Sequence, residues 1–163
     1  MSYYPLAKGN SWTYKMKDGN SYVNEVTGDN AGTFTMKNSL MPQTGEMRKE
    51  GDTYLANHWD GKSFQALLKE NAKPGENWEV KFTANGLESV LVMTVKETGI
   101  SKDVEGRNYP DVILVEAESK LAMNGNLMSL NYFTQYYYAK DVGLILTTTS
   151  SGDSHALTNF ILN

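Results

Sequence analysis

The chain has 163 residues, of which 40% are hydrophobic and 21% charged, a composition that excludes an intrinsically disordered protein and favours a single domain over residues 1–163. The net charge is −4 and the basic residues are scattered, so nucleic acid is not expected as a partner. The absence of cysteine excludes disulfides, thiol catalysis and cysteine-ligated zinc.

The first part of the chain reads as short alternating strands joined by tight turns. Between residues 11 and 17, the side chains of Trp12, Tyr14 and Met16 fall on one face and polar side chains on the other, as in a half-buried strand. Asp18-Gly19-Asn20 then supplies a turn. Strands are expected at residues 11–17, 22–27, 33–37, 46–50, 53–57 and 64–69. The last of these contains Ala and Leu residues that would also suit a helical turn.

The second part of the chain continues in the same way. Lys73-Pro74-Gly75-Glu76 is a strong turn, and after it Trp78, Val80 and Phe82 alternate with polar residues. Residues 99–106 are expected to form a polar loop. Further strands are expected at residues 88–97, 112–121, 128–138 and 144–149, and residues 156–162 close the domain.

These elements predict an all-β domain of about ten or eleven strands with little helix. Because no crossover helix is available, the sheet must be antiparallel. So many strands leave exposed edges unless the sheet curls, so we expect a strongly curved sheet that forms an open or half barrel. Residues 9–15 and 75–81 share the pattern G-x-x-W-x-[YV]-K. They are either two turn glycines before a buried Trp or the trace of a duplicated meander, with halves at 1–70 and 71–163.

Three segments carry a resemblance to a known group. They are Tyr4-Pro5-Leu6-Ala7-Lys8-Gly9-Asn10-Ser11-Trp12-Thr13-Tyr14, then Leu67-Leu68-Lys69 with Lys73-Pro74-Gly75-Glu76-Asn77-Trp78, and Tyr137-Tyr138-Ala139-Lys140-Asp141-Val142-Gly143-Leu144-Ile145. This pattern resembles bacterial envelope proteins of unknown function that are similar to lipoprotein-carrier (LolA/LolB-like) half-barrels. The resemblance implies a curved antiparallel sheet around an apolar concavity, and it transfers no functional residue.

The sequence leaves the compartment open. The N-terminus has no signal peptide and no lipidation cysteine, and no apolar run is long enough to span a membrane. We expect a periplasmic or envelope-associated protein if a signal was removed from this chain, and a cytoplasmic protein otherwise.

No pattern in the sequence predicts a catalytic site, a metal site or a cofactor. His58 and His155 lack partners at metal-binding spacing, and Ser154 and Asp153 are too close in sequence to His155 to form a catalytic triad with it. Asp60-Gly61-Lys62-Ser63 is similar to the end of a phosphate loop, but Ala56 stands where that loop needs glycine.

A group of acidic residues is the remaining candidate for chemistry. Glu116 and Glu118 share one face of a strand, and beside Asp111 they could bind a cation or act as acid and base. Their alternation with apolar residues is typical of a solvated face, which is the favoured interpretation.

Aromatic residues provide the best candidate for a binding site. Seven of them fall on the apolar parity of their strands and would line the concave face: Trp12, Tyr14, Trp78, Phe82, Tyr132, Tyr136 and Tyr138. They either fill the core or surround a ligand, whose polar group the Tyr and Trp tips could orient. Tyr137 falls on the opposite face and would suit a homodimer interface.

We therefore expect a non-enzymatic binding module for an apolar or amphipathic, lipid-like small molecule. The eight methionines support this expectation because their side chains adapt to varied shapes. The alternatives are a structural or protein-interaction domain with a fully packed core, and a hydrolase with an unrecognised carboxylate and histidine site.

Overall fold

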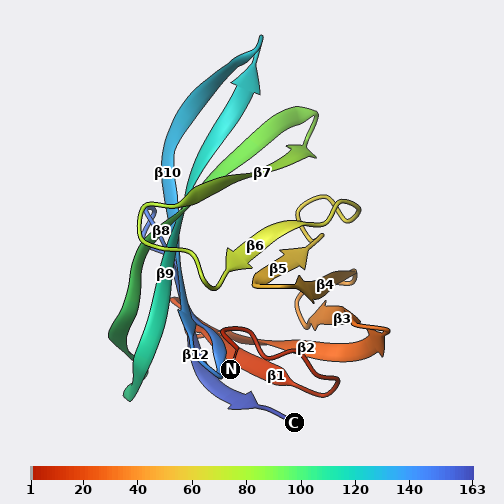
Figure 1. Cartoon of the computed structure of the whole chain (residues 1–163), viewed down its shortest axis with the longest axis vertical. Helices are drawn as coiled ribbons and strands as arrows, with labels where there is room; N and C mark the ends of the chain where they lie inside the picture. The colour runs from red at the N-terminus through yellow and green to blue at the C-terminus, as the bar shows by residue number, and fades with distance from the viewer. Residues whose placement is uncertain (1) are drawn as a thin grey trace.

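The computed structural model describes residues 2–163, and within them every strand belongs to one antiparallel sheet (Figure 1). The strands are β1 (Ser11–Met16), β2 (Ser21–Asn30), β3 (Thr33–Asn38), β4 (Thr44–Glu50), β5 (Thr53–Ala56), β6 (Gln65–Lys69), β7 (Asn77–Ala84), β8 (Leu87–Val104), β9 (Arg107–Met123), β10 (Asn126–Ala139), β11 (Gly143–Thr149) and β12 (Ser154–Ile161). Their order in the sheet is β6-β5-β4-β3-β2-β1-β12-β11-β10-β9-β8-β7.

This order describes two six-stranded meanders, β1–β6 and β7–β12, joined side by side where β1 pairs with β12. The sheet curls until its two edge strands, β6 and β7, come close together, so that it is nearly closed into a barrel. Near closure brings the two edge strands opposite each other, whereas a flat twelve-stranded sheet would leave them exposed at its two sides.

Side chains take the place of backbone pairing along the seam between β6 and β7. The side-chain amide of Gln65 donates to the Lys81 carbonyl at 2.6 Å and accepts from the Lys81 N–H at 2.7 Å. The Trp78 indole N–H donates to the Ala66 carbonyl at 2.9 Å. Because a primary amide carries the same donor and acceptor as a peptide group, Gln65 bridges the two edges as a short piece of strand would.

The predicted all-β antiparallel fold is confirmed, with twelve strands where about ten or eleven were expected. The ambiguous residues 64–69 lie mainly in strand β6. The expected polar loop at residues 99–106 is wrong: β8 continues through it to Val104, and the only turn is at Glu105-Gly106, where both residues have positive φ. Three register shifts between Val95 and Lys102 interrupt the alternation of β8, which explains why the sequence pattern fades there.

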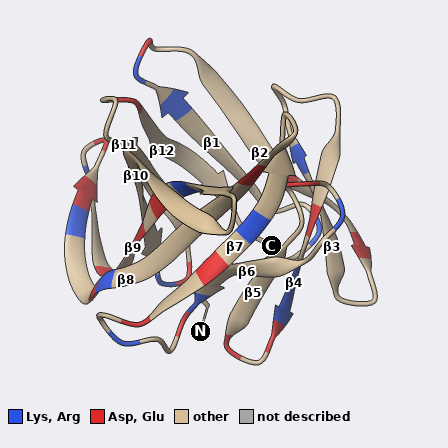
Figure 2. Ribbon diagram, turned by 90° about the horizontal axis from the view of Figure 1, so that it is seen from above, with Lys and Arg blue, Asp and Glu red and all other residues tan. Residues whose placement is uncertain are grey.

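Strands β7 to β10 extend past the rest of the sheet and curve over its open end (Figure 1). We call residues 77–95 and 115–136 of these strands the projection. The face of the projection that turns toward the barrel interior is its inner face, and the opposite one is its outer face. Charged side chains of both signs are interspersed along the strands of the whole molecule (Figure 2).

Candidate ligand-binding face

The interior of the barrel is filled by the N-terminal segment of the chain. Tyr4 is 5% exposed, and its ring centroid lies 5.2 Å from that of Trp12 and 6.3 Å from those of Tyr54 and Tyr138. These partners come from β1, β5 and β10, which are far apart in the sheet. One aromatic ring therefore joins three walls of the barrel, at spacings typical of favourable aromatic pairs.

Like Trp78 at the seam, two further aromatic residues predicted to line a cavity use their polar tips within the fold. The Trp12 indole N–H donates to the Val142 carbonyl and the Tyr14 hydroxyl donates to the Leu144 carbonyl, both at 2.7 Å. Gly143 allows this close approach, because a Cβ there would lie 3.0 Å from the Trp12 Nε1 atom and the φ of Gly143 is +117°. The fold thus occupies the hydrogen-bonding groups of Trp12 and Tyr14.

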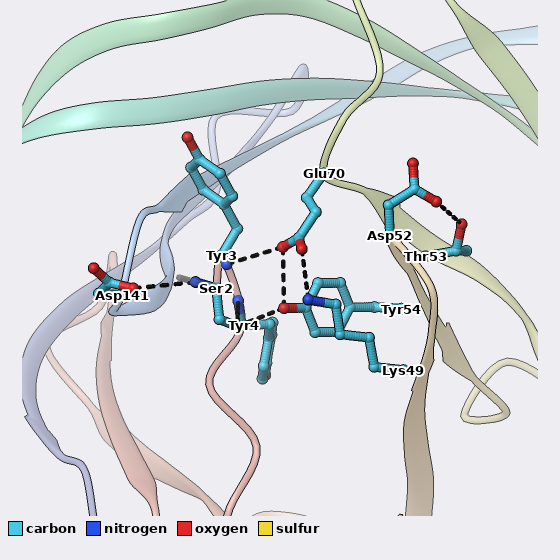
Figure 3. A network of polar contacts seen from close by, with 9 residues as sticks. All are labelled: Ser2, Tyr3, Tyr4, Lys49, Asp52, Thr53, Tyr54, Glu70 and Asp141. Carbon is cyan, nitrogen blue, oxygen red and sulfur yellow. Dashed lines mark hydrogen bonds and ion pairs between the residues drawn. The ribbon is translucent and has the colours of Figure 1, made fainter.

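A carboxylate network holds the N-terminal segment in place (Figure 3). The Glu70 carboxylate accepts hydrogen bonds from the Tyr3 backbone N–H, the Tyr54 hydroxyl and the Lys49 ammonium group. The Glu70 side chain is 13% exposed, so these contacts are shielded from water. The Lys49 pKa is raised, chiefly by its hydrogen bond to Glu70. Burial is the main cause of the raised Tyr54 pKa.

The inner face of the projection follows from the strand register. Trp78 pairs with Met93, and both side chains are buried in the barrel core, so all residues of the same parity share that face. On β7 and β8 the inner face comprises Trp78, Val80, Phe82, Ala84, Leu87, Ser89, Leu91, Met93 and Val95. On β9 and β10 it comprises Val115, Ala117, Ser119, Leu121, Met123, Asn126, Met128, Thr134 and Tyr136.

The far end of the projection is apolar and open to solvent. Five of the eight exposed large hydrophobic residues gather there, so this clustering is not the usual scatter of single surface side chains. They are Leu87 at 50%, Met123 at 46%, Leu127 at 47%, Met128 at 53% and Leu130 at 50% exposure. Met128 pairs with Leu121 on the inner face, whereas Leu127 pairs with Ala122 on the outer face. Leu130 lies in an irregular stretch of β10 between these pairs and Phe133.

Formal charge is confined to the outer face of the projection. By register, none of the inner-face residues named above is an aspartate, glutamate, lysine or arginine. The outer face carries Glu79, Lys81, Glu88, Glu116, Glu118 and Lys120. An apolar surface on one side and a mixed-charge surface on the other is the pattern of a sheet with a binding or packing role for its inner side.

A row of polar side chains crosses the inner face where the projection meets the barrel. Tyr136 on β10 pairs with Thr147 on β11, and Thr147 pairs with His155 on β12. His155 Nδ1 lies 2.5 Å from the hydroxyl oxygen of Tyr22, and burial raises the Tyr22 pKa to about 12. The inner face therefore passes from exposed apolar residues at its end to uncharged hydrogen-bonding groups at its base.

The structure separates the seven aromatic residues predicted to line a cavity into two groups. Trp12, Tyr14, Trp78 and Tyr138 are buried in the core. Phe82, Tyr132 and Tyr136 are half-buried and lie on the projection. Tyr132 falls in the irregular stretch of β10, and its hydroxyl lies 3.4 Å from Ser151 Oγ.

Two open grooves occur on the described surface. One, of about 470 Å³, lies mostly against the outer face of the projection and includes Val90, Ala122 and Leu127 in its lining. The other, of about 390 Å³, lies between two hairpin turns and is lined by Lys17, Asp18, Asp153, Ser154, His155 and Met16. Neither groove contains a grouping typical of a catalytic site.

The other chemical candidates of the sequence take structural roles. His58 stacks on Trp59 at 4.2 Å between ring centroids. Glu116 lies 4.0 Å from Lys96 and accepts from Gln135, and Glu118 accepts from Ser129, all on the outer face.

Asp111 accepts a hydrogen bond from the Tyr3 hydroxyl. Tyr137, expected on the opposite face, lies under the ammonium group of Lys102 at 4.8 Å. Within residues 2–163, no group of three or more histidines and carboxylates is placed to hold a metal ion.

Sequence reasoning missed the residues that define the inner face. Leu91 lies between Val90 and Val92, and Ala122 separates Leu121 from Met123, so the sequence has no clean alternation that marks this face. It could not reveal that the end of the projection has no opposing layer, because this depends on how far β7–β10 extend past the barrel.

The fold and this face define an all-β, barrel-like domain with an uncharged apolar surface at one end. No family model matches the sequence, and no curated protein matches it either. The chain is similar in structure to a crystal structure described as a "putative exported protein with YmcC-like fold" from Bacteroides fragilis, with a TM-score of 0.59, 9% identity, and coverage of 97% of this chain and 98% of that one.

A second solved structure, described as a "putative lipoprotein" from Parabacteroides distasonis, gives a TM-score of 0.58 at 11% identity, with 98% of each chain covered. At these identities the similarity shows the fold alone: the chain has the same architecture as these two proteins over nearly its whole length. No helix within residues 2–163 is long and apolar enough to cross a membrane.

Proposed function

We propose that this protein is a non-enzymatic binding module that holds an apolar or amphipathic small molecule against the inner face of the projection. The observation that carries the proposal is the cluster of exposed apolar side chains at the end of a face that bears no formal charge. Exposed apolar area of this kind gains free energy when a partner removes it from water, at roughly 25 cal/mol per Å².

The structural neighbours support a location in the bacterial envelope. One is described as exported and the other as a lipoprotein. A carrier or sensor of apolar molecules in the envelope would need an uncharged surface of this kind, because such molecules are sparingly soluble in the surrounding water. We therefore propose a periplasmic or envelope-associated location for the protein.

Adjacent residues on β10 offer a matched test of the proposal. Met128 is 53% exposed on the inner face, and Leu127 is 47% exposed on the outer face. The neutral probe N-phenyl-1-naphthylamine should fluoresce on binding the wild-type protein. Met128→Asp should weaken its binding at least about tenfold, because a carboxylate must be desolvated against apolar surface. Leu127→Asp should leave it within about twofold of wild type, with both variants equally stable because both sites are exposed.

Two outcomes would contradict the proposal. Equal loss of probe binding in both variants would show nonspecific adsorption to exposed apolar residues. No saturable binding to the wild-type protein, combined with a dimer that Met128→Asp converts to a monomer in light scattering, would assign the face to a protein interface instead.

A further inference from the structure

We infer that the ligand of the inner face is an uncharged amphiphile: an apolar chain or ring system that ends in hydroxyl or carbonyl groups, and not an acid, an amine or a zwitterion. This inference rests on the proposed function and adds the chemical class of the ligand. Three features of the inner face support it: the apolar side chains at its end, the hydroxyl groups at its base, and the lack of formal charge along the projection.

The apolar end of the inner face can cover a hydrocarbon group. Leu87, Met123 and Met128 are each about half exposed there, and Leu91 and Leu121 continue the surface toward the barrel. Leucine and methionine side chains make only dispersion contacts, and the flexible methionine side chain adapts to ligands of varied shape. Ser89, Ser119 and Asn126 are the polar side chains of inner parity in this part of the face, and none of them carries a charge.

The base of the inner face can bind a neutral polar group. Thr134, Tyr136 and Thr147 are half-buried and of inner parity. None of the side-chain hydrogen bonds within residues 2–163 uses the hydroxyls of these three residues, whereas the neighbouring Thr148 hydroxyl donates to Gln135. Each hydroxyl has one donor and two acceptor sites, which suits a ligand hydroxyl or carbonyl.

Within the projection, the inner face offers no counter-charge to a charged head group. Lys81, Glu116 and Lys120 all have outer parity, so the sheet itself separates them from a ligand on the inner face. Burying an ionised carboxylate or ammonium group without an opposite charge is far more costly than burying a hydroxyl that finds a hydrogen bond. The Nδ1 atom of His155, which belongs to the polar row, is engaged with the hydroxyl of Tyr22.

Competition among three amphiphiles of equal chain length tests this inference. The probe N-phenyl-1-naphthylamine is bound first, and 1-monolauroylglycerol, laurate and dodecyltrimethylammonium are then titrated at about pH 8, each below its micellar concentration. Monolauroylglycerol should displace the probe at a concentration at least about tenfold lower than either charged competitor, because only its head group meets matching groups on the face.

A threonine variant links this preference to the base of the inner face. Thr147→Val keeps the shape of the side chain and removes its hydroxyl. It should weaken displacement by monolauroylglycerol at least about threefold and leave binding of the probe unchanged, because the probe has little need of a hydroxyl partner. Thr148→Val, whose hydroxyl bonds to Gln135 within the protein, is the control and should leave both unchanged.

The outcomes separate the two claims. Displacement by laurate or by dodecyltrimethylammonium within tenfold of monolauroylglycerol would overturn the inference about charge, while the proposed function would stand. An unchanged monolauroylglycerol affinity in Thr147→Val would equally overturn the assignment of the head group to this row. Failure of the wild-type protein to bind the probe at all would overturn the proposed function itself.

Discussion

Tyr4 shows how single residues complete the barrel. The alternation around Trp12 and Tyr14 predicted that both would point inward, and both are buried. Tyr4 lies outside any alternating segment, and its burial depends on contacts with Tyr54 and Tyr138 from distant strands. A sequence pattern of period two carries no information on such contacts, so the filling of the interior could not be predicted.

We predict that Tyr4→Ala lowers the free energy of unfolding by about 3–5 kcal/mol, because it leaves a cavity among three aromatic residues. Tyr4→Phe should cost less than about 1 kcal/mol, since the ring contacts remain. Urea denaturation of both variants measures the difference. Equal losses would show that the hydroxyl, and not the ring, holds the segment.

A second residue-scale prediction concerns the carboxylate that fixes the N-terminal segment. Glu70→Gln removes the charge that Lys49 and the Tyr3 N–H contact, and should lower the free energy of unfolding by about 1–3 kcal/mol. Glu50→Gln is the matched control, because Glu50 pairs with Arg48 at the surface, where a salt bridge contributes at most about 1 kcal/mol. Limited proteolysis should cut the N-terminal segment faster only in Glu70→Gln. Equal effects would contradict the anchoring role.

At the scale of elements, strand positions could be predicted well, and their lengths and neighbours less well. Trp78, Val80 and Phe82 indicate β7 directly by alternation. The sequence pattern predicts strands shorter than β8 and β9 are. Register shifts between Val95 and Lys102 break the alternation there, although the backbone hydrogen bonding of the strand pair continues. The position of β6 beside β7 depends on the curvature of the whole sheet, so the bridging role of Gln65 could not be read from the sequence.

The seam between β6 and β7 gives a prediction at this scale. Gln65→Ala removes both hydrogen bonds to the Lys81 backbone and should cost about 1–2 kcal/mol of stability. Amide hydrogen exchange at Lys81 should accelerate, because its N–H loses its acceptor. Gln43→Ala, in the exposed turn between β3 and β4, is the control. Unchanged exchange at Lys81 would show that the seam is closed by packing alone.

At the scale of the whole molecule, the antiparallel β class and the curvature of the sheet followed from strand count and the lack of helices. The two meanders β1–β6 and β7–β12 begin with Trp12 and Trp78 near their starts, and an origin by duplication stays a prediction. A single domain over residues 1–163 also stays a prediction. The extension of β7–β10 into a projection has no counterpart in the first meander. The longest strand there, β2, has 10 residues, whereas β8, β9 and β10 have 18, 17 and 14, and this difference creates the inner face.

Buried tyrosines make the stability of the molecule sensitive to alkaline pH. Burial raises the pKa values of Tyr4, Tyr14 and Tyr138 above the ordinary value, and that of Tyr22 to about 12. The unfolded chain releases these protons near pH 10, whereas the folded chain retains them, so unfolding is favoured as pH rises above about 10. Below that pH the contribution is constant.

We therefore predict that the melting temperature is insensitive to tyrosine ionisation below about pH 10 and falls steeply above it. Tyrosinate absorbance should rise mainly in one cooperative step that coincides with unfolding. A single non-cooperative step near pH 10, with the fold retained, would contradict the buried cluster.

Methionine methyl resonances can report whether the inner face of the projection binds an uncharged apolar ligand. Met123 and Met128 lie at the end of the projection, whereas Met41 is equally exposed, at 57%, in the turn between β3 and β4. In a titration with 1-monolauroylglycerol followed by ¹³C-methyl methionine NMR, the account predicts saturable shifts at Met123 and Met128 with Met41 unchanged. Shifts at Met41 of the same size, or none at Met123 and Met128, would contradict it.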